Sequence, residues 1–221
     1  MVKNVVKQLI AVSAAVMMVV LPARAELIQS ESPHELLKQV AEQTFARIGD
    51  DRNQIDENLD YLRTIVEEEM MPYVDWQFAA NKTLGRYYKD TPEEQRREFQ
   101  RVFRDYLIAT YARAFLQYDE SKHTVEFEPP RDNYENVAVV RTRVVEEGRP
   151  PIRMDFSMRL DRQDKIWKAY DLTVEGISLL DSKQAEINAV IRARGMAETI
   201  NLLREKAAEP IRADDEVEVP A

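Results

Sequence analysis

The sequence predicts an α+β fold, in which one antiparallel sheet of about four strands lies between N-terminal and C-terminal helices. Three observations lead to this class. Apolar residues recur at three- and four-residue spacing from Leu36 to Tyr118, as on helices that bury one face. Between residues 124 and 174, apolar and polar residues alternate, as on strands with one buried face. Helical spacing then returns from Asp181 to Lys206.

The composition fits a single globular domain. The chain has 221 residues, of which 44% are hydrophobic, and this is enough for a sizeable core. It contains no cysteine, so neither a disulfide nor a lipid-anchored cysteine is possible. The packed core therefore has to stabilise the fold alone.

The first 25 residues have the pattern of a secretory signal peptide. Lys3 and Lys7 precede the uncharged stretch Leu9 to Leu21, and Ala23-Arg-Ala25 is a small-residue cleavage site. A membrane-spanning anchor needs roughly 20 apolar residues, which is more than this stretch provides. We therefore expect export, cleavage after Ala25 and a mature chain that begins at Glu26.

Cleavage makes the protein more acidic. The net charge of the whole chain is -9, and removal of Lys3, Lys7 and Arg24 changes it to -12. Nucleic acid is not expected as a partner, because phosphate binding needs a positive surface. The charge also disfavours simple attraction to anionic lipid surfaces. The alternative, that the charge only keeps an exported protein soluble, stays open.

Three helices are expected before residue 90. Ser32-Pro-His-Glu35 has the pattern of a capping box with proline at the first helical position, and Gly49-Asp-Asp51 ends this helix. A second amphipathic helix is expected from Gln54 to Met71, and Pro72 is expected to end or kink it. A short third helix ends at Gly85.

The longest helix is expected to begin at the capping pattern Thr91-Pro-Glu-Glu94. Its first half is amphipathic, but from Tyr106 to Tyr118 apolar or aromatic residues fall on most sides. Such a segment either runs through the middle of the domain or faces an apolar group that is not part of the chain. The sequence leaves both interpretations open.

A meander of four strands follows, with the ranges Thr124 to Glu128, Glu135 to Glu146, Ile152 to Leu160, and Ile166 to Val174. The last two strands form a hairpin, and Gly176 is expected to end the sheet. One face of the hairpin is apolar and must be covered by protein or by a ligand. This face carries Ile152, Met154, Phe156, Met158, Leu160, Leu172 and Val174, with either Trp167 or Tyr170.

Two helices and a tail are expected after the sheet. Gly195 separates a helix from Asp181 to Arg194 from a shorter helix, Ala197 to Lys206. The acidic residues near the end of the chain have nothing to bury, so residues 209–221 are expected to form a disordered tail. Residues 26–208 then form the single domain.

Catalytic and metal-binding patterns are scarce. His34 and His123 have no metal-ligand spacing with each other. Gly176-Ile-Ser-Leu-Leu180 resembles a nucleophile elbow but lacks the closing glycine. Asp171 and Glu175, on one strand face, are the best acid and base candidates, although such residues usually form a solvated face. We expect no enzyme, no catalytic residue, no metal and no cofactor.

Six segments follow one another along the chain in a specific order and spacing: Tyr61-Leu-Arg-Thr-Ile-Val-Glu67, Met71-Pro-Tyr-Val-Asp75, Leu84-Gly-Arg-Tyr-Tyr-Lys89, Tyr106-Leu-Ile-Ala-Thr-Tyr111, Met154-Asp-Phe156 and Trp167-Lys-Ala-Tyr-Asp-Leu-Thr-Val-Glu-Gly-Ile-Ser178. Together they resemble the MlaC family, the periplasmic phospholipid-binding proteins of the Mla lipid-asymmetry pathway, also called toluene-tolerance or ABC transporter auxiliary proteins. The resemblance spans about Ser32 to Leu203. Ile187 departs from it, because an aromatic residue is expected there.

The resemblance implies a curved sheet wrapped by helices, similar to the nuclear-transport-factor-like cone, with an acyl-chain cavity between sheet and helices. It implies a soluble periplasmic carrier that encloses two acyl chains, leaves the head group at the mouth and shuttles phospholipid to maintain outer-membrane asymmetry. The implied partners are an inner-membrane MCE-type ABC transporter complex and an outer-membrane lipoprotein-porin complex.

The implied cavity would be lined by the apolar half-helix and the hairpin. The candidate lining residues are Tyr106, Tyr111, Phe115, Met154, Phe156, Met158, Tyr170, Leu172, Val174 and Ile177. Methionine adapts to variable chains, and tyrosine can place its ring on a chain and its hydroxyl toward water. Residues of these types are also common in ordinary cores. Two other functions stay open: a small-molecule enzyme on the same fold, and a periplasmic chaperone or adaptor with an exposed apolar patch.

Overall fold

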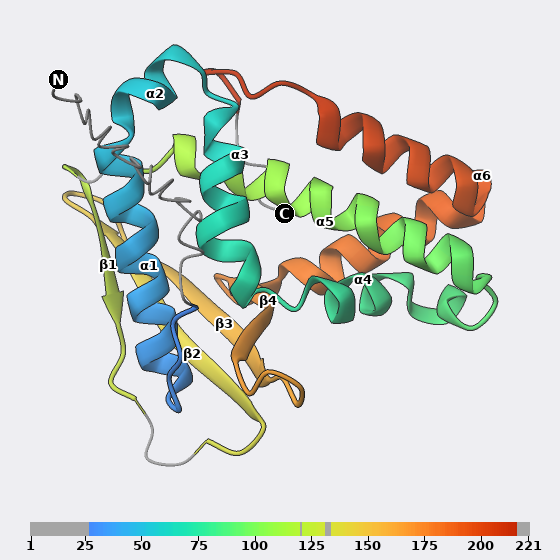
Figure 1. Cartoon of the computed structure of the whole chain (residues 1–221), viewed down its shortest axis with the longest axis horizontal. Helices are drawn as coiled ribbons and strands as arrows, with labels where there is room; N and C mark the ends of the chain where they lie inside the picture. Colours follow the sequence, from blue (N-terminus) through green and yellow to red (C-terminus); the bar gives the residue numbers. More distant parts are fainter. Residues whose placement is uncertain (1–26, 120, 131–133, 216–221) are drawn as a thin grey trace, which may run out of the picture.

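The computed structural model describes residues 27–119, 121–130 and 134–215 (Figure 1). The predicted signal peptide, residues 1–25, lies outside these ranges. Within the described part of the chain, no helix has the length and the apolar character needed to cross a membrane.

The first helix forms as its sequence predicts. Helix α1 spans Pro33–Asp50, and the Ser32 hydroxyl accepts a hydrogen bond from the Glu35 N–H at 3.3 Å. One N–H of the first turn is thereby satisfied. Apolar side chains at helical spacing, such as Leu36 and Val40, are buried on one face of α1.

The predicted single helix from Gln54 to Met71 is wrong. The chain forms α2 (Arg52–Glu57), α3 (Tyr61–Ile65), a π-helical turn η1 (Val66–Met70) and a 3-10 turn η2 (Met71–Tyr73). The break lies at Asn58, whose backbone is extended and whose side-chain oxygen accepts a hydrogen bond from the Asp60 N–H at 3.2 Å. This local bond competes with helix continuation, as is common for asparagine.

The next two helices differ in how they begin. Helix α4 (Trp76–Leu84) is capped by Asp75, and it leads into the 3-10 turn η3 (Gly85–Tyr88). Helix α5 (Glu93–Leu116) has no side-chain cap, so the predicted capping role of Thr91 is wrong. The Thr91 hydroxyl instead donates a hydrogen bond to the Tyr87 carbonyl at 2.7 Å, which ties it to the preceding turn.

The sheet is an antiparallel meander with five strands in sequence order: β1 (His123–Phe127), β2 (Val137–Glu146), β3 (Ile152–Leu160), β4 (Trp167–Val174) and β5 (Ile177–Ser178). The four predicted strands are confirmed, but the prediction that Gly176 ends the sheet is wrong. Glu175 and Gly176 both have positive φ, the geometry of a two-residue hairpin turn, and β5 pairs back onto Val174.

Helix α6 (Leu179–Ala208) completes the fold. Gly195, with φ 80° and ψ 171°, interrupts its helical geometry, so the two predicted helices meet at a sharp kink. This combination of angles is essentially restricted to glycine. The second half of α6 consequently folds back beside α5 (Figure 1).

The elements form a sheet region and a helical layer. Helix α1 lies over one face of the sheet, which we call the inner face, and α4, α5 and α6 pack together beside the β4 edge (Figure 1). Val137 and Val139 point to the opposite, outer face, because they alternate with the buried Val140. They are 65% and 44% exposed.

Buried side chains form three clusters rather than one contiguous core, which is unusual for a single domain. The sheet cluster joins α1 to the inner face and includes Leu36, Val40, Tyr73, Val140, Met158 and Trp167. The middle cluster joins α1, α3 and α5 and includes Ile48, Leu62, Ile65, Met71, Ile108 and Ile211. The helix cluster joins α4, α5 and α6 and includes Phe99, Phe103, Tyr106, Leu180, Ile187 and Leu203.

The described part of the predicted tail, residues 209–215, packs onto the domain. Ile211 is buried in the middle cluster, and the backbone carbonyl of Glu209 accepts hydrogen bonds from Arg63 and Arg113. The Arg113 side chain also pairs with Asp215 at 3.1 Å. These contacts differ from the expectation of a disordered segment that begins at 209. Residues 216–221 lie outside the described ranges.

Candidate functional site

The inner face of the β3-β4 hairpin brings four of the candidate residues together. Met154 pairs with Val174 and Phe156 pairs with Leu172, so all four side chains project from the same face. Each is only half-buried, although the face is turned toward the protein. Phe156 packs against the sheet cluster, whereas the other three belong to none of the three clusters of described residues.

A bulge separates these residues from the rest of the hairpin. The register shifts between Ser157 and Met158, and Met158 pairs with Ala169, which leaves Tyr170 without a strand partner. Met158 is 1% exposed inside the sheet cluster. Tyr170 packs against the helix cluster and meets the Phe78 ring edge-on at 5.1 Å. The bulge therefore gives Tyr170 surroundings that differ from those of its neighbours on β4. Met158 stays on the same face as Met154 and Phe156 and is packed there against the sheet cluster.

The candidates on α5 also lie in different surroundings. Tyr106 is buried in the helix cluster, and Lys183 lies over its ring at 5.1 Å. Tyr111 and Phe115 are half-buried at the margin of the middle cluster. Helix α5 thus contacts two clusters, which explains why apolar residues fall on most of its sides.

Tyr111 links α5 to β4 electrostatically. Burial, together with the charges of Asp171 and Tyr106, raises the pKa of its hydroxyl to about 12. The side chain is therefore deep in the molecule, yet part of its surface remains accessible. Ile177, the remaining candidate, lies on β5 opposite Val174 and is 38% exposed.

The acid and base candidates have structural roles. Asp171 accepts hydrogen bonds from the Leu180 N–H at 3.0 Å and from the Ser178 hydroxyl at 2.7 Å, at the start of α6. Ser178 in turn caps α6 by accepting from the Asp181 N–H. The Glu175 carboxylate accepts from the backbone N–H of Arg153. Asp171 and Glu175 therefore bind different backbone segments and do not form a pair.

The histidines are also tied to the backbone. His34 Nε2 lies 2.7 Å from the Glu128 carbonyl, and His123 Nδ1 accepts from the Asp119 N–H at 3.0 Å. No group of three or more metal-ligating side chains occurs among the residues that the structure describes.

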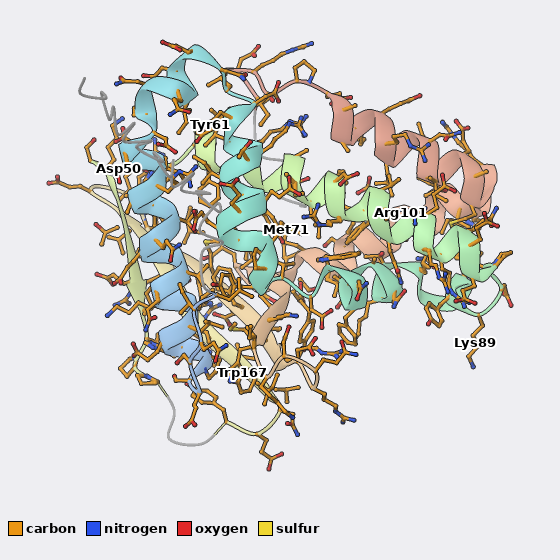
Figure 2. The ribbon with its side chains drawn as sticks, in the orientation of Figure 1. Asp50, Tyr61, Met71, Lys89, Arg101 and Trp167 are labelled. Carbon is orange, nitrogen blue, oxygen red and sulfur yellow. The ribbon has the colours of Figure 1, made fainter. Side chains whose placement is uncertain are left out.

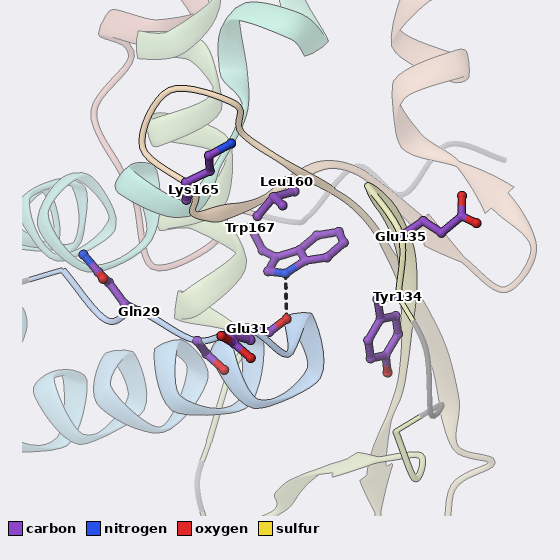
Figure 3. A pocket seen from close by; sticks show the side chains of 8 residues that line it. Gln29, Glu31, Tyr134, Glu135, Leu160, Lys165 and Trp167 are labelled. Carbon is purple, nitrogen blue, oxygen red and sulfur yellow. Dashed lines mark hydrogen bonds between the residues drawn. The ribbon is translucent and has the colours of Figure 1, made fainter.

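A pocket that sequence reasoning missed lies at the N-terminal end of α1. It has a volume of about 410 Å³ and is lined by Gln29, Ser30, Glu31, Tyr134, Glu135, Leu160, Lys165 and Trp167. Trp167 donates a hydrogen bond from its indole nitrogen to the Glu31 carbonyl at 3.0 Å (Figure 3). The alternation of the hairpin does not predict which face of the sheet Trp167 occupies. None of the ten candidate lining residues contributes to this pocket.

The fold and the candidate residues define an α+β domain whose inner sheet face carries half-buried apolar side chains. The chain belongs to the MlaC family, because the family model described as MlaC protein matches residues 38–205. The intermembrane phospholipid transport system binding protein MlaC of Haemophilus influenzae is 32% identical over 186 residues, which cover 83% of this chain and 86% of that protein. The resemblance inferred from the six segments is confirmed.

A solved structure has the same fold. The phospholipid-binding protein from Ralstonia solanacearum, determined in complex with a phospholipid, matches with a TM-score of 0.70 and 25% sequence identity. The match covers 80% of this chain and 97% of that chain. The predicted α+β fold class is therefore confirmed.

Proposed function

We propose that this protein is a soluble periplasmic carrier that binds phospholipid through its acyl chains and moves it between the two membranes. Membership of the MlaC family supports the proposal, and so do the phospholipid transport and binding named for its relatives. The carried lipid would lie between the inner face of the β3-β4 hairpin and α5.

The proposal depends on one observation: apolar side chains on the inner face and on α5 remain accessible outside the three packed clusters or at their margin. Met154, Leu172 and Val174 face inward and retain accessible surface outside the three clusters. Tyr111 and Phe115 retain accessible surface at the margin of the middle cluster. Apolar side chains that remain accessible inside a protein favour an apolar occupant, because their burial against acyl chains removes apolar surface from water. Met158, Tyr106 and Tyr170 are packed, so we exclude them from the proposed lining.

Energetics explain why a carrier is needed. Each methylene group transferred to water costs roughly 0.8 kcal/mol, so two acyl chains with about 30 methylenes would cost about 24 kcal/mol to expose. A phospholipid therefore crosses an aqueous space only if its chains are enclosed. The charged head group is expensive to bury and would stay at the mouth.

The proposed cellular context follows from the family. The chain would be exported by its signal peptide, residues 1–25, and would exchange lipid with an inner-membrane MCE-type ABC transporter complex and an outer-membrane lipoprotein-porin complex. We propose no catalytic role, since Asp171 and Glu175 are engaged in separate structural hydrogen bonds. A chaperone or adaptor is less favoured, because the relatives are named for phospholipid transport and phospholipid binding.

Mass spectrometry of the natively purified protein tests the proposal. The intact mass under native conditions should exceed the denatured mass by that of one diacyl phospholipid. Met154→Glu places an unpaired charge on the inner face and should remove the lipid while the protein stays folded. Val139→Glu, on the outer face of the neighbouring strand, is the matched control and should retain it. Equal native and denatured masses for the wild-type protein would contradict the proposed function.

A further inference from the structure

Tyr111 is an interior tyrosine whose hydroxyl forms no hydrogen bond with any residue that the structure describes. Tyr73 and Tyr61 differ from Tyr111 in this respect. The Tyr73 hydroxyl accepts from the Ile28 N–H at 2.7 Å, and the Tyr61 hydroxyl donates to Asp51 at 3.0 Å. A buried hydroxyl without a partner costs free energy, so the Tyr111 hydroxyl calls for an acceptor from outside the chain.

The Tyr111 oxygen is not sealed inside packed protein. Among the described residues, the fully enclosed side-chain polar atoms without a hydrogen-bond partner belong to His34, Asp75 and Asp155. The Tyr111 oxygen is not one of them, so it contacts accessible space although its ring lies deep in the molecule. A small acceptor group can therefore reach it.

The surroundings select the kind of acceptor. With a pKa of about 12, the hydroxyl stays protonated at neutral pH and can donate. The carboxylate of Asp171 lies near enough to raise that pKa, and its negative charge disfavours a second anion in the same place. Phe115 and the middle cluster make the adjacent wall apolar. A neutral carbonyl oxygen attached to apolar chains fits these conditions better than a phosphate group does.

We infer that the Tyr111 hydroxyl donates a hydrogen bond to an acyl-ester carbonyl of the bound lipid. This inference rests on the proposed lipid-carrier function and adds a selectivity to it. The hydrogen bond fixes how deep the glycerol backbone sits, so the site favours diacyl lipids over dialkyl lipids, whose ether oxygens are weaker acceptors. The charged head group then lies farther out than Tyr111.

Equilibrium binding of two matched lipids tests the inference. Delipidated protein is titrated with diacyl phosphatidylglycerol and with dialkyl phosphatidylglycerol of equal chain length. The wild-type protein should bind the ester about three- to tenfold more tightly, the range of one net hydrogen bond. Tyr111→Phe should bind both lipids with the affinity that the wild-type protein has for the ether. Tyr88→Phe, 39% exposed beside Lys89 at the far end of the helical layer, is the control (Figure 2).

The outcomes separate the two proposals. If the wild-type protein binds neither lipid, the carrier function itself fails. If it binds both equally, or if Tyr111→Phe keeps the ester preference, the carrier function stands and this inference is overturned. If Tyr111→Phe does not fold, the infrared carbonyl band of isotope-labelled ester lipid on the wild-type protein decides. A shift to lower frequency relative to lipid in hydrocarbon supports the bond, and an unshifted band overturns it.

Discussion

At the scale of single residues, the sequence predicts the same lining role for Met158 and Ile177, but their surroundings differ. Met158 is 1% exposed and packs between α1 and the sheet, whereas Ile177 is 38% exposed on a two-residue strand. A charge at Met158 would be buried without a partner, while a charge at Ile177 can reach water. The two positions should therefore respond differently to the same substitution.

Glutamate substitutions test this difference. Ile177→Glu should change the free energy of unfolding by less than about 1 kcal/mol but should greatly reduce co-purified phospholipid. Met158→Glu should lose about 4 kcal/mol or more of stability, because the carboxylate has no partner in the sheet cluster. Urea denaturation and lipid extraction measure the two effects, and Val137→Glu on the exposed outer face serves as the control. Full lipid content in Ile177→Glu would remove this residue from the proposed lining.

The raised pKa of Tyr111 predicts a pH effect on stability. Its hydroxyl has an ordinary pKa of 10.0 and a pKa of about 12 in the fold, so the neutral form is favoured in the folded state. The corresponding stability is fully present below pH 10 and is lost as the pH rises through 12. Delipidated wild-type protein should lose about 2 to 3 kcal/mol more than Tyr111→Phe between these limits. Equal losses, measured by urea denaturation, would assign the effect to other groups.

At the scale of elements, the C-terminal segment is integrated with the domain. Ile211 fills a position in the middle cluster, and Arg63 and Arg113 hold the adjacent backbone carbonyls. The segment therefore packs against α3 and α5. An acidic composition alone gave no sign of this contact.

Truncation separates the packed segment from the residues that follow it. A chain that ends at Ala208 should lose about 2 to 4 kcal/mol of unfolding free energy, because the Ile211 side chain and the bonds to Glu209 are removed. A chain that ends at Asp215 should be as stable as the full protein. Urea denaturation of the two chains gives the comparison, and Ile211→Ala should reproduce most of the loss.

Local chemistry explains which elements could be predicted. The cap at Ser32 and the alternation from Ile152 to Leu160 depend on neighbouring residues alone, and both are confirmed. The break at Asn58 depends on one asparagine bond within an otherwise regular apolar pattern. Thr91 has the sequence of a cap but finds an acceptor in the preceding turn. Pattern reasoning does not rank such competing bonds.

Local sequence patterns also predict only part of the candidate site. Alternation correctly placed Met154, Phe156, Leu172 and Val174 on one face of the sheet. It did not separate Tyr170 from this set, because the bulge at Tyr170 depends on pairing between two strands. It did not separate Met158 either, because Leu36 and Val40 of the distant helix α1 cover that side chain. Contacts between distant segments decide which buried residues belong to which cluster. The periodicity of one segment carries no information about such contacts.

At the scale of the whole molecule, the division of the buried residues into three clusters predicts a dependence of stability on lipid. A ligand that binds only the folded state stabilises it by about 4 kcal/mol at a thousandfold excess over its Kd. Delipidated protein should therefore melt at a lower temperature than the lipid-bound form, and added phospholipid should restore the melting temperature. Met154→Glu should melt at the same temperature with and without added lipid. A wild-type melting temperature that is independent of lipid would argue against an interior occupant.

The accessible interior also has a mechanical consequence. Internal space that unfolding eliminates makes the unfolded state smaller in volume, and hydrostatic pressure favours the state of smaller volume. The lipid-free protein should therefore unfold at lower pressure than the loaded protein, even at a temperature where both are folded at atmospheric pressure. In the proposed arrangement, acyl chains between the β3-β4 hairpin and α5 would act as an incompressible filling. The difference in unfolding volume between the two forms would then measure how much space the lipid occupies.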